Sequence, residues 1–323
     1  MRAFQGSLHH PAQRGWSEPH LHASQLIYPL FISEKIEDVP ISGFAPHMQW
    51  GNDTQYASLV THLEPLMKSG LKSIMLFGIV VEKDVTGSRA YDTPVLSALR
   101  ILRKAFPTLC IACDVCLCEY TSHGHCGILQ KDTCDIINNE ASIAILAEIA
   151  VIYGNAGADI VAPSDMMDNR IGSIRTALNE AHLQRVSIMA YTSKKASALY
   201  APFRSAVDST FTGNRARYQH PVGSTCHAAQ AYDRDVHQGA DSVIVKPSLF
   251  YTDLIQSFAT LKKVPVVAYM VSGEYKMLMD YGTGTEDVES IVKEAHISLL
   301  RAGASVIITY FTPQLLQDWL PKW

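Results

Sequence analysis

A short apolar segment followed by a longer amphipathic segment recurs eight times along this chain. The apolar segments are nearly continuous in hydrophobic residues instead of alternating, which is typical of β-strands buried on both faces. They span residues 26–32, 73–80, 109–116, 160–164, 186–192, 242–247, 266–272 and 306–311. Eight strand–helix units of about 40 residues each fit a (β/α)8 barrel. The sequence therefore predicts an α/β chain whose residues 23–323 form one barrel.

The junctions between helices and strands support this interpretation. Gly157, Gly239 and Gly303 each follow a helix-like stretch and precede a small residue and a strand. Glycine just past a helix end suits the left-handed backbone conformation that closes the helix. The alternative is an open doubly wound sheet, which usually carries a glycine-rich phosphate turn after its first strand. The first strand here continues as LIYPLFISEK without such a turn, which favours the barrel.

Residues 1–22 are polar, lack helical or strand periodicity, and include His9, His10, His20 and His22. We interpret them as an N-terminal arm outside the core. A free arm of this kind is usually disordered unless something holds it. We therefore expect this arm to pack on another subunit of a homo-oligomer.

Composition excludes several classes of partner and location. Net charge is −4, from 27 basic and 31 acidic residues, and like charges do not cluster, so neither nucleic acid nor an anionic membrane is an expected partner. No apolar run approaches the roughly 18 to 20 residues that span a bilayer. The first residues, MRAFQGSLHHPAQRGW, contain no apolar core of a secretory signal. Seven cysteines in a chain of 323 residues do not suggest a disulfide framework, and we expect a reducing, cytoplasmic location.

Six of the seven cysteines lie between residues 110 and 134, and the densest stretch is CDVCLCEYTSHGHC, residues 113–126. Cys116 and Cys118 alternate along an extended backbone, so their side chains share a face. Cys126 can return across the glycine-bearing loop as a third thiolate. Thiolate ligands suit Zn²⁺, and three of them leave a coordination position open, as in catalytic zinc sites.

Two other interpretations of the cysteines stay open. The site could be a closed structural one in which His123 or His125 is the fourth ligand. The thiols could also be inert and buried. We expect the remaining cysteines to pack in the core; they are Cys110, Cys113, Cys134 and Cys226.

Two lysines follow neighbouring predicted strands. Lys246 ends the strand VIVKP, and Lys194 lies in YTSKK after the preceding strand. Burial lowers the pKa of a lysine, and a second ammonium group nearby lowers it further, so such an amine can attack a carbonyl group. We expect Lys195, beside Lys194, to be solvated.

Polar residues gather where the predicted strands end, which in such barrels is the mouth that carries the active site. They are Asp114, Ser164, Asp165, Tyr191, Lys194, Lys246, Ser272 and Tyr310. A polar loop at 202–222 adds Arg204, Arg215, Arg217 and Gln219. Arginines above the mouth suit a carboxylate substrate, which they can hold in a bidentate contact.

Seven segments together resemble the porphobilinogen synthase family, also called 5-aminolevulinate dehydratases. They are CDVCLCEYTSHGHCG, VAPSDMMDNRIGSIR, YTSKKAS, YAPFRSA, VIVKP, VSGEY and IITYFTPQLL. The likeness runs in consistent order from about Leu26 to Trp319, and the cysteines match the zinc-dependent branch. It implies a (β/α)8 barrel whose arm wraps a neighbouring subunit, usually in a homo-octamer. It also implies the condensation of two molecules of 5-aminolevulinate into porphobilinogen, on the route to haem.

The resemblance also implies residue roles. Lys246 would form a Schiff base with the substrate that supplies the propionate side, and Lys194 with the acetate-side substrate. The implied zinc ligands are Cys116, Cys118 and Cys126. The implied carboxylate ligands are Arg204, Arg215 and Gln219 for the acetate-side substrate and Ser272 and Tyr310 for the other. The implied pocket residues are Asp114, Ser164, Asp165 and Tyr200, with Asp114 a candidate for proton transfer.

Three positions depart from the family pattern. Ser248 stands where glycine is usual, and Lys195 replaces an aromatic residue beside the reactive lysine. Arg217 stands where animal members often have a cysteine that binds a second zinc together with the histidine matching His125, so we do not expect that second site.

Two other functions remain as alternatives: a Schiff-base aldolase on the same barrel, using one lysine, and a zinc-binding interaction protein without catalysis.

Overall fold

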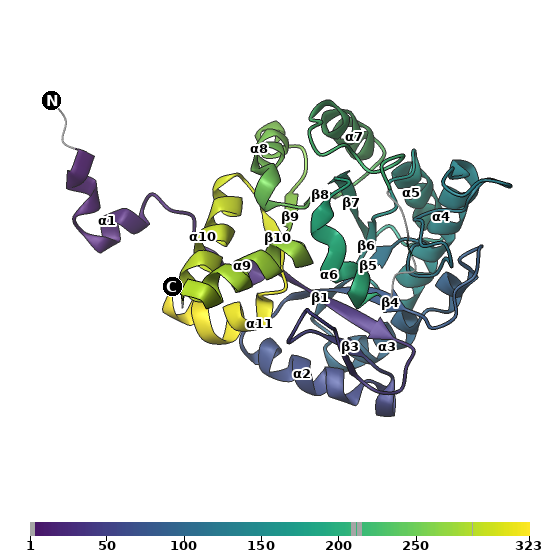
Figure 1. Cartoon of the computed structure of the whole chain (residues 1–323), viewed down its shortest axis with the longest axis horizontal. Helices are drawn as coiled ribbons and strands as arrows, with labels where there is room; N and C mark the ends of the chain where they lie inside the picture. Colours follow the sequence, from purple (N-terminus) through teal and green to yellow (C-terminus); the bar gives the residue numbers. More distant parts are fainter. Residues whose placement is uncertain (1–3, 208–210, 212–214, 286) are drawn as a thin grey trace.

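Eight parallel strands form a closed barrel in the computed structural model (Figure 1). The structure describes residues 4–207, 211, 215–285 and 287–323, with only the backbone of residues 4, 202, 204 and 205. The barrel strands are β1 (Leu26–Ser33), β4 (Ser73–Ile79), β5 (Cys110–Val115), β6 (Ile160–Pro163), β7 (Ser187–Lys194), β8 (Ser242–Lys246), β9 (Val266–Tyr269) and β10 (Val306–Ile308). β10 pairs with β1, Leu26 opposite Ile307, which closes the sheet and confirms the predicted barrel.

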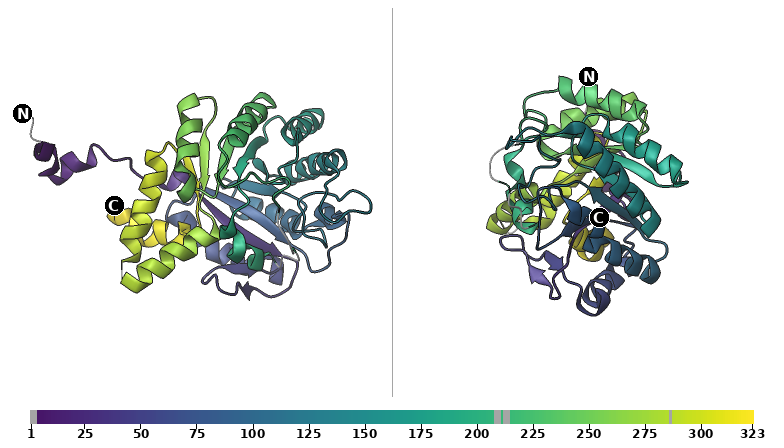
Figure 2. Two further views of the ribbon diagram at one scale, coloured as in Figure 1. Left: turned by 45° about the horizontal axis from the view of Figure 1, so that its top comes forward. Right: turned by 90° about the vertical axis from the view of Figure 1, so that its right-hand side faces the viewer.

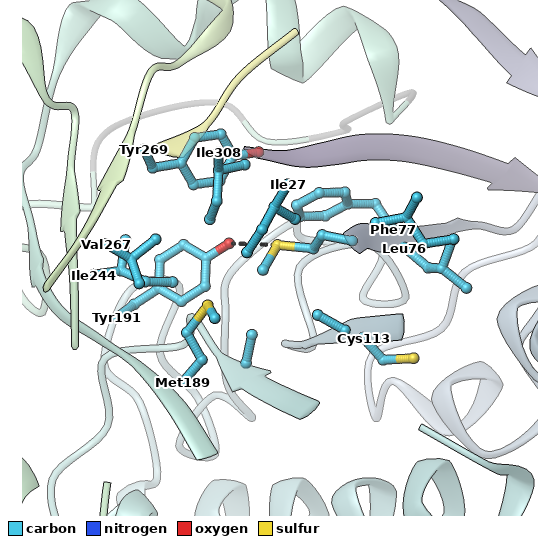
Figure 3. Close-up of a cluster of buried hydrophobic side chains, with 14 of the residues drawn as sticks. Ile27, Leu76, Phe77, Cys113, Met189, Tyr191, Ile244, Val267, Tyr269 and Ile308 are labelled. Atoms are coloured by element: carbon cyan, nitrogen blue, oxygen red, sulfur yellow. Dashed lines mark hydrogen bonds between the residues drawn. The ribbon is translucent and has the colours of Figure 1, made fainter. Parts of the chain in front are cut away.

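The continuous apolar strands are buried because side chains of one face fill the barrel and those of the other contact the helices. All eight residues of β1 are buried. Figure 3 shows part of the interior, where Ile27, Ile244 and Val267 lie close to Tyr191. The Tyr191 hydroxyl lies 3.6 Å from the sulfur of Met75 (Figure 3). The interior is therefore a packed core, and space for a ligand exists only toward its ends.

Helices surround the barrel, as the amphipathic segments predicted (Figures 1 and 2). They are α2 (Ala57–Lys68), α3 (Pro94–Ala105), α4 (Asn139–Ala156), α5 (Arg170–Glu180), α7 (Cys226–His237), α8 (Thr252–Leu261), α10 (Val288–Arg301) and the short α11 (Thr312–Gln314). The predicted closing glycines have left-handed backbones, with φ of 109° at Gly157, 99° at Gly239 and 107° at Gly303. Within the described chain, none of the helices has both the length and the apolar character that crossing a bilayer requires.

Additional elements surround the mouth at the carboxyl ends of the strands. A short hairpin, β2 (Val39–Pro40) and β3 (Met48–Trp50), extends the sheet because Gln49 of β3 pairs with Phe31 near the end of β1. Helix α6 (Ala201–Ala206) packs against α9 (Ser272–Thr285). The seventh strand is shorter than predicted: β9 ends at Tyr269, and Ser272 begins α9.

Residues 4–22 extend away from the barrel and include α1 (Pro11–Gly15) (Figure 2). No residue of α1 is buried, and 79% of Trp16 is exposed. Helix α1 and Trp16 thus lie outside the barrel core, whereas Leu21 at the end of the segment is buried in it. What the arm contacts in an assembly remains a prediction.

Candidate active site

Lys194 and Lys246 lie side by side at the mouth of the barrel. They are register partners at the ends of β7 and β8, and only 5% and 4% of their surfaces are exposed. Both line a cavity of about 20 Å³, which Phe203 and Arg215 also border. This volume holds about one water molecule, so substrate entry requires the lining to move.

Aromatic rings surround the Lys246 amine. Its Nζ lies 4.0 Å from the ring centroid of Tyr269, 5.0 Å from that of Phe203 and 5.1 Å from that of Tyr191. Burial, followed by the nearby Lys194 charge, lowers the pKa of Lys246 to about 7. A neutral amine is therefore available near neutral pH, and a neutral amine is the nucleophile that Schiff-base formation requires.

Lys194 has a polar environment that leads to a carboxyl group. Its Nζ donates a hydrogen bond of 2.6 Å to the carbonyl oxygen of Ser164, whose hydroxyl donates to Oδ2 of Asp114 at 3.0 Å. Burial, and then the charge of Glu119, raises the pKa of Asp114 to about 7. A carboxyl group with such a pKa can both accept and release protons near neutral pH.

The three predicted metal ligands converge beside the lysines. Sγ atoms of Cys116, Cys118 and Cys126 all lie within 4.8 Å of one another, and all three side chains are buried. Hydrogen bonds from the Cys116 and Cys118 thiols hold the pKa of Cys126 well below its usual range, and nearby Arg215 and Lys194 add to this effect. Three converging sulfur atoms in a positively charged environment fit a thiophilic divalent metal.

The two neighbouring histidines make hydrogen bonds outside the thiol cluster. Nδ1 of His123 accepts one of 3.1 Å from the backbone N–H of His125. Nδ1 of His125 lies 3.0 Å from the Tyr218 hydroxyl. Among the described residues, the group of possible ligands around the three thiols includes no imidazole. Arg217 pairs with Asp135 at 2.6 Å. The arrangement thus matches the three-thiolate interpretation better than the closed four-ligand one.

The predicted acetate-side carboxylate ligands are only partly within the described structure. Arg215 borders the cavity and donates from Nη2 to the carbonyl oxygen of Gly124 at 2.7 Å. Two buried donors have no hydrogen-bond partner in the described part of the chain: Nε of Arg215 and Nε2 of Gln219. These N–H groups can donate hydrogen bonds to a bound anion. The side chain of Arg204 lies outside the described residues, as do residues 208–210 and 212–214 of the same loop.

The other predicted carboxylate ligands are Ser272, the first residue of α9, and Tyr310, which follows β10. The Ser272 hydroxyl accepts a hydrogen bond of 2.9 Å from the backbone N–H of Phe203. The Tyr310 hydroxyl lies 3.3 Å from that of Tyr269, whose ring covers Lys246. Both are buried, and neither borders the small cavity in this conformation.

Two further predicted pocket residues differ in position. Tyr200 borders the cavity, and its hydroxyl donates to the carbonyl oxygens of Lys195 at 2.8 Å and Lys246 at 3.2 Å. Asp165 is fully buried behind the mouth, 3.5 Å from Nε of Arg170. Its contacts support a role in holding the end of β6 more than direct contact with a substrate.

Three expectations from the sequence were wrong. Lys195 is buried, not solvated, because its Nζ donates to the carbonyl oxygens of Pro221 and Ser224 and so has partners without water. Cys134 and Cys226 are exposed, not packed in the core. Cys134 lies in the loop between β5 and α4, and Cys226 begins α7 on the solvent side, so neither position meets the core.

Sequence reasoning missed several residues of the site. Glu119 is buried and borders the cavity. One of its carboxylate oxygens lies within 4.8 Å of a carboxylate oxygen of Asp114 and of Sγ of Cys116. Its position next to Cys118 could have indicated it. Tyr269 and Phe203 cover Lys246, but apolar residues near strand ends carry no local signal that separates a site wall from the core.

Comparison with known proteins gives consistent results. The family model for delta-aminolevulinic acid dehydratase matches residues 3–318. The delta-aminolevulinic acid dehydratase of Candida glabrata is 44% identical, covering 98% of this chain and 94% of that protein. The enzyme of Bos taurus is also 44% identical, covering 97% and 96%. The solved structure of the Toxoplasma gondii ME49 enzyme, in complex with its reaction product porphobilinogen, has a TM-score of 0.93 at 32% identity and covers 98% and 91% of the two chains.

Proposed function

This chain belongs to the delta-aminolevulinic acid dehydratase family, and we propose that the lysine pair at its barrel mouth performs the family's chemistry. The chain is a hydro-lyase that condenses two molecules of 5-aminolevulinate into porphobilinogen with loss of two water molecules. One observation carries the residue assignment: Lys194 and Lys246 are register partners on one cavity, directly beside the three thiols.

Lys246 attacks first in this proposal because its environment leaves the amine neutral. The nitrogen adds to the ketone carbon of the propionate-side substrate, and water leaves as the iminium forms. The iminium withdraws electrons and acidifies the adjacent carbon. Lys194 forms the second Schiff base with the acetate-side substrate. Asp114, linked to Lys194 through Ser164, accepts and returns protons during these steps.

Cys116, Cys118 and Cys126 hold the metal in this proposal, and we assign it as zinc because all three ligands are thiolates. Bound zinc with an open position would supply Lewis-acid polarisation of a substrate carbonyl or amine. Arg217, exposed and paired with Asp135, offers no ligand for a second zinc.

Two identical substrates need two different carboxylate sites. Arg204, Arg215 and Gln219 bind the acetate-side carboxylate, and the unpartnered donors of Arg215 and Gln219 support this. Ser272 and Tyr310 bind the other. Asp165 accepts from the backbone N–H of Met167 just after β6, and Tyr200 donates to backbone carbonyls at the ends of β7 and β8, so both hold the backbone around the mouth.

We further propose a homo-octamer in which the arm, residues 1–22, contacts a neighbouring subunit. The exposure of Trp16 supports an apolar contact there. A cytoplasmic location agrees with seven cysteines that are all free.

The test is pyrrole formation from 5-aminolevulinate, developed with an aldehyde reagent. The zinc-loaded protein should form pyrrole, chelation should stop it, and zinc should restore it. Lys194→Ala and Lys246→Ala should each be inactive, whereas Lys104→Ala, at an exposed position of α3, should keep full activity. An active Lys194→Ala variant would instead favour a one-lysine aldolase mechanism.

A further inference from the structure

A single buried carboxylate, Glu274, joins the ends of β8 and β9. Its Oε1 accepts hydrogen bonds from the backbone N–H groups of Ser248 at 2.9 Å and Leu249 at 2.6 Å. Its Oε2 accepts from the backbone N–H of Val271 at 2.7 Å, and the Ser248 hydroxyl lies 3.5 Å from the same oxygen. One side chain thus holds two loops that follow different strands.

The contact with Val271 has a local reason. Helix α9 begins at Ser272, so Val271 precedes the helix and Glu274 is its third residue. A glutamate at this position commonly accepts from the N–H before the helix, as one half of a capping box. The contacts with Ser248 and Leu249 go beyond capping because those residues belong to the loop after β8.

Burying the Glu274 carboxylate costs free energy because a charged group loses its contact with water. It is fully buried, and within the described chain no lysine, arginine or histidine pairs with it. Burial raises its pKa to about 7 although the backbone hydrogen bonds act in the opposite direction. A buried carboxylate without a cation destabilises the fold unless hydrogen bonds compensate. Here three backbone N–H donors compensate, and they hold the carboxylate between the two loops.

The two loops that Glu274 joins carry two proposed substrate contacts. Lys246 lies two residues before Ser248, and Ser272 directly follows Val271. The backbone of α9 at Gly273 packs closely against Leu199, where a Cβ would lie 2.8 Å from the Leu199 Cα, so the start of α9 cannot shift toward that segment. The Glu274 carboxylate directly links the loop after Lys246 to the residue before Ser272, so it contributes to the separation between the Lys246 amine and the Ser272 hydroxyl.

Resting on the proposed function of Lys246 and Ser272, we propose that Glu274 is a positioning residue that sets the length of keto acid able to react at Lys246. In 5-aminolevulinate, two methylene groups separate the carboxylate from the ketone carbon. When Ser272 binds the carboxylate, only a ketone at that distance meets the amine. A misplacement of about 1 Å can cost about 100-fold in rate, so holding the two loops together selects the chain length.

The experiment compares two probes that lack the amino group, 4-oxopentanoate and 5-oxohexanoate, which differ by one methylene. The amine of Lys246 displaces the ketone oxygen as water, and borohydride then delivers hydride to the iminium carbon, leaving a secondary amine that mass spectrometry locates. The wild-type protein, zinc-loaded, should favour the shorter acid by about 10- to 200-fold, the usual discrimination for one methylene.

Glu274→Gln removes one acceptor selectively. The amide oxygen can still accept from Ser248 and Leu249, but the amide NH₂ then faces the Val271 N–H, and two donors repel. We expect the preference for 4-oxopentanoate to fall about tenfold, mainly through slower trapping of the shorter acid. Glu294→Gln, at an exposed position of α10, is the matched control and should keep the wild-type preference. If Glu274→Gln does not fold, Glu274→Asp keeps the charge but shortens its reach, with the same expected loss.

Different outcomes test the role of Lys246 and the positioning role of Glu274. Absence of any adduct on Lys246 of the wild-type protein would refute the proposed role of Lys246. Trapping at Lys246 with an unchanged length preference in a folded Glu274 variant would overturn the positioning role alone. Equal slowing of both acids would indicate a general loss of structure and would also overturn it.

Discussion

At the scale of single residues, the two lysines show how environment divides identical side chains between roles. Lys194 donates to a backbone carbonyl, whereas Lys246 meets aromatic ring faces. A ring face attracts an ammonium ion less strongly than water does, so burial favours the neutral amine at Lys246. At Lys194 burial also lowers the pKa, but the charges of Cys126, Cys116 and Cys118 outweigh it and raise the pKa, so Lys246 is the lysine with a neutral amine near pH 7.

The first prediction concerns the pH dependence of Lys246. Since its pKa is lowered to about 7, the neutral fraction falls as pH decreases through 7. The rate of borohydride trapping with 4-oxopentanoate should therefore level off above pH 8 and be about tenfold lower at pH 6. Lys194→Met removes a neighbouring positive charge, so the midpoint should move to higher pH. A midpoint that stays near 7 in Lys194→Met would contradict the charge coupling.

At the scale of elements, the loop after β5 concentrates the thiols that a metal needs. We therefore expect oxidation to affect the activity more than the fold. The barrel strands close independently of the loop, since β5 pairs with β4 and β6 through residues that precede Cys116.

The second prediction follows from that separation. Treatment with a thiol oxidant should abolish pyrrole formation and displace zinc, while the melting temperature changes by only a few degrees. The same treatment is applied to the double variant Cys134→Ser, Cys226→Ser, which lacks the two exposed thiols. Inactivation should persist in this variant. Resistance of the double variant would assign the sensitivity to the exposed cysteines instead.

The third prediction compares two glycines in helical segments. Gly157 ends α4 with φ of 109°, where a side chain is strained, so Gly157→Ala should destabilise the fold by about 1 kcal/mol. Gly172 lies inside α5, and a Cβ there would meet Gln238 at an ordinary 3.5 Å, so Gly172→Ala should stabilise by about 0.5–1 kcal/mol. Urea unfolding measures both. Shifts of the same sign would contradict the backbone argument.

At the scale of the whole molecule, the arm and the barrel differ in how they gain stability. The barrel buries its own apolar residues, whereas the arm leaves Trp16 and Leu8 exposed at 79% and 55%. Apolar side chains on a projecting segment lose contact with water when a second chain covers them.

The fourth prediction tests the arm. Deleting residues 1–22 should leave a folded barrel, by circular dichroism, but should give a smaller assembly than the proposed octamer in sedimentation velocity. Trp16→Ala should weaken the assembly in the same direction. Val85→Ala removes a comparably exposed apolar side chain from a barrel loop and is the control. An octamer that survives the deletion would refute the role of the arm.

Much of the fold and the candidate site could be predicted from the sequence because the relevant signals are local. Continuous apolar runs in β1 and β4, and glycines such as Gly157 with positive φ, depend on neighbouring residues only. Cys116, Cys118 and Cys126 lie close in the chain, so their convergence required little of the tertiary structure.

The tertiary structure alone decided which residues surround the reacting groups. Tyr269 reaches Lys246 from the next strand, Lys195 finds carbonyl partners 26 and 29 residues away, and Glu274 joins loops about 25 residues apart. Burial and hydrogen bonding of this kind depend on contacts between distant segments, which no local pattern encodes. The sequence by itself thus determined the barrel, the lysines and the thiols. Their separations, pKa values and supporting contacts follow only once the strands close, because only closure brings distant side chains together and removes water from between them.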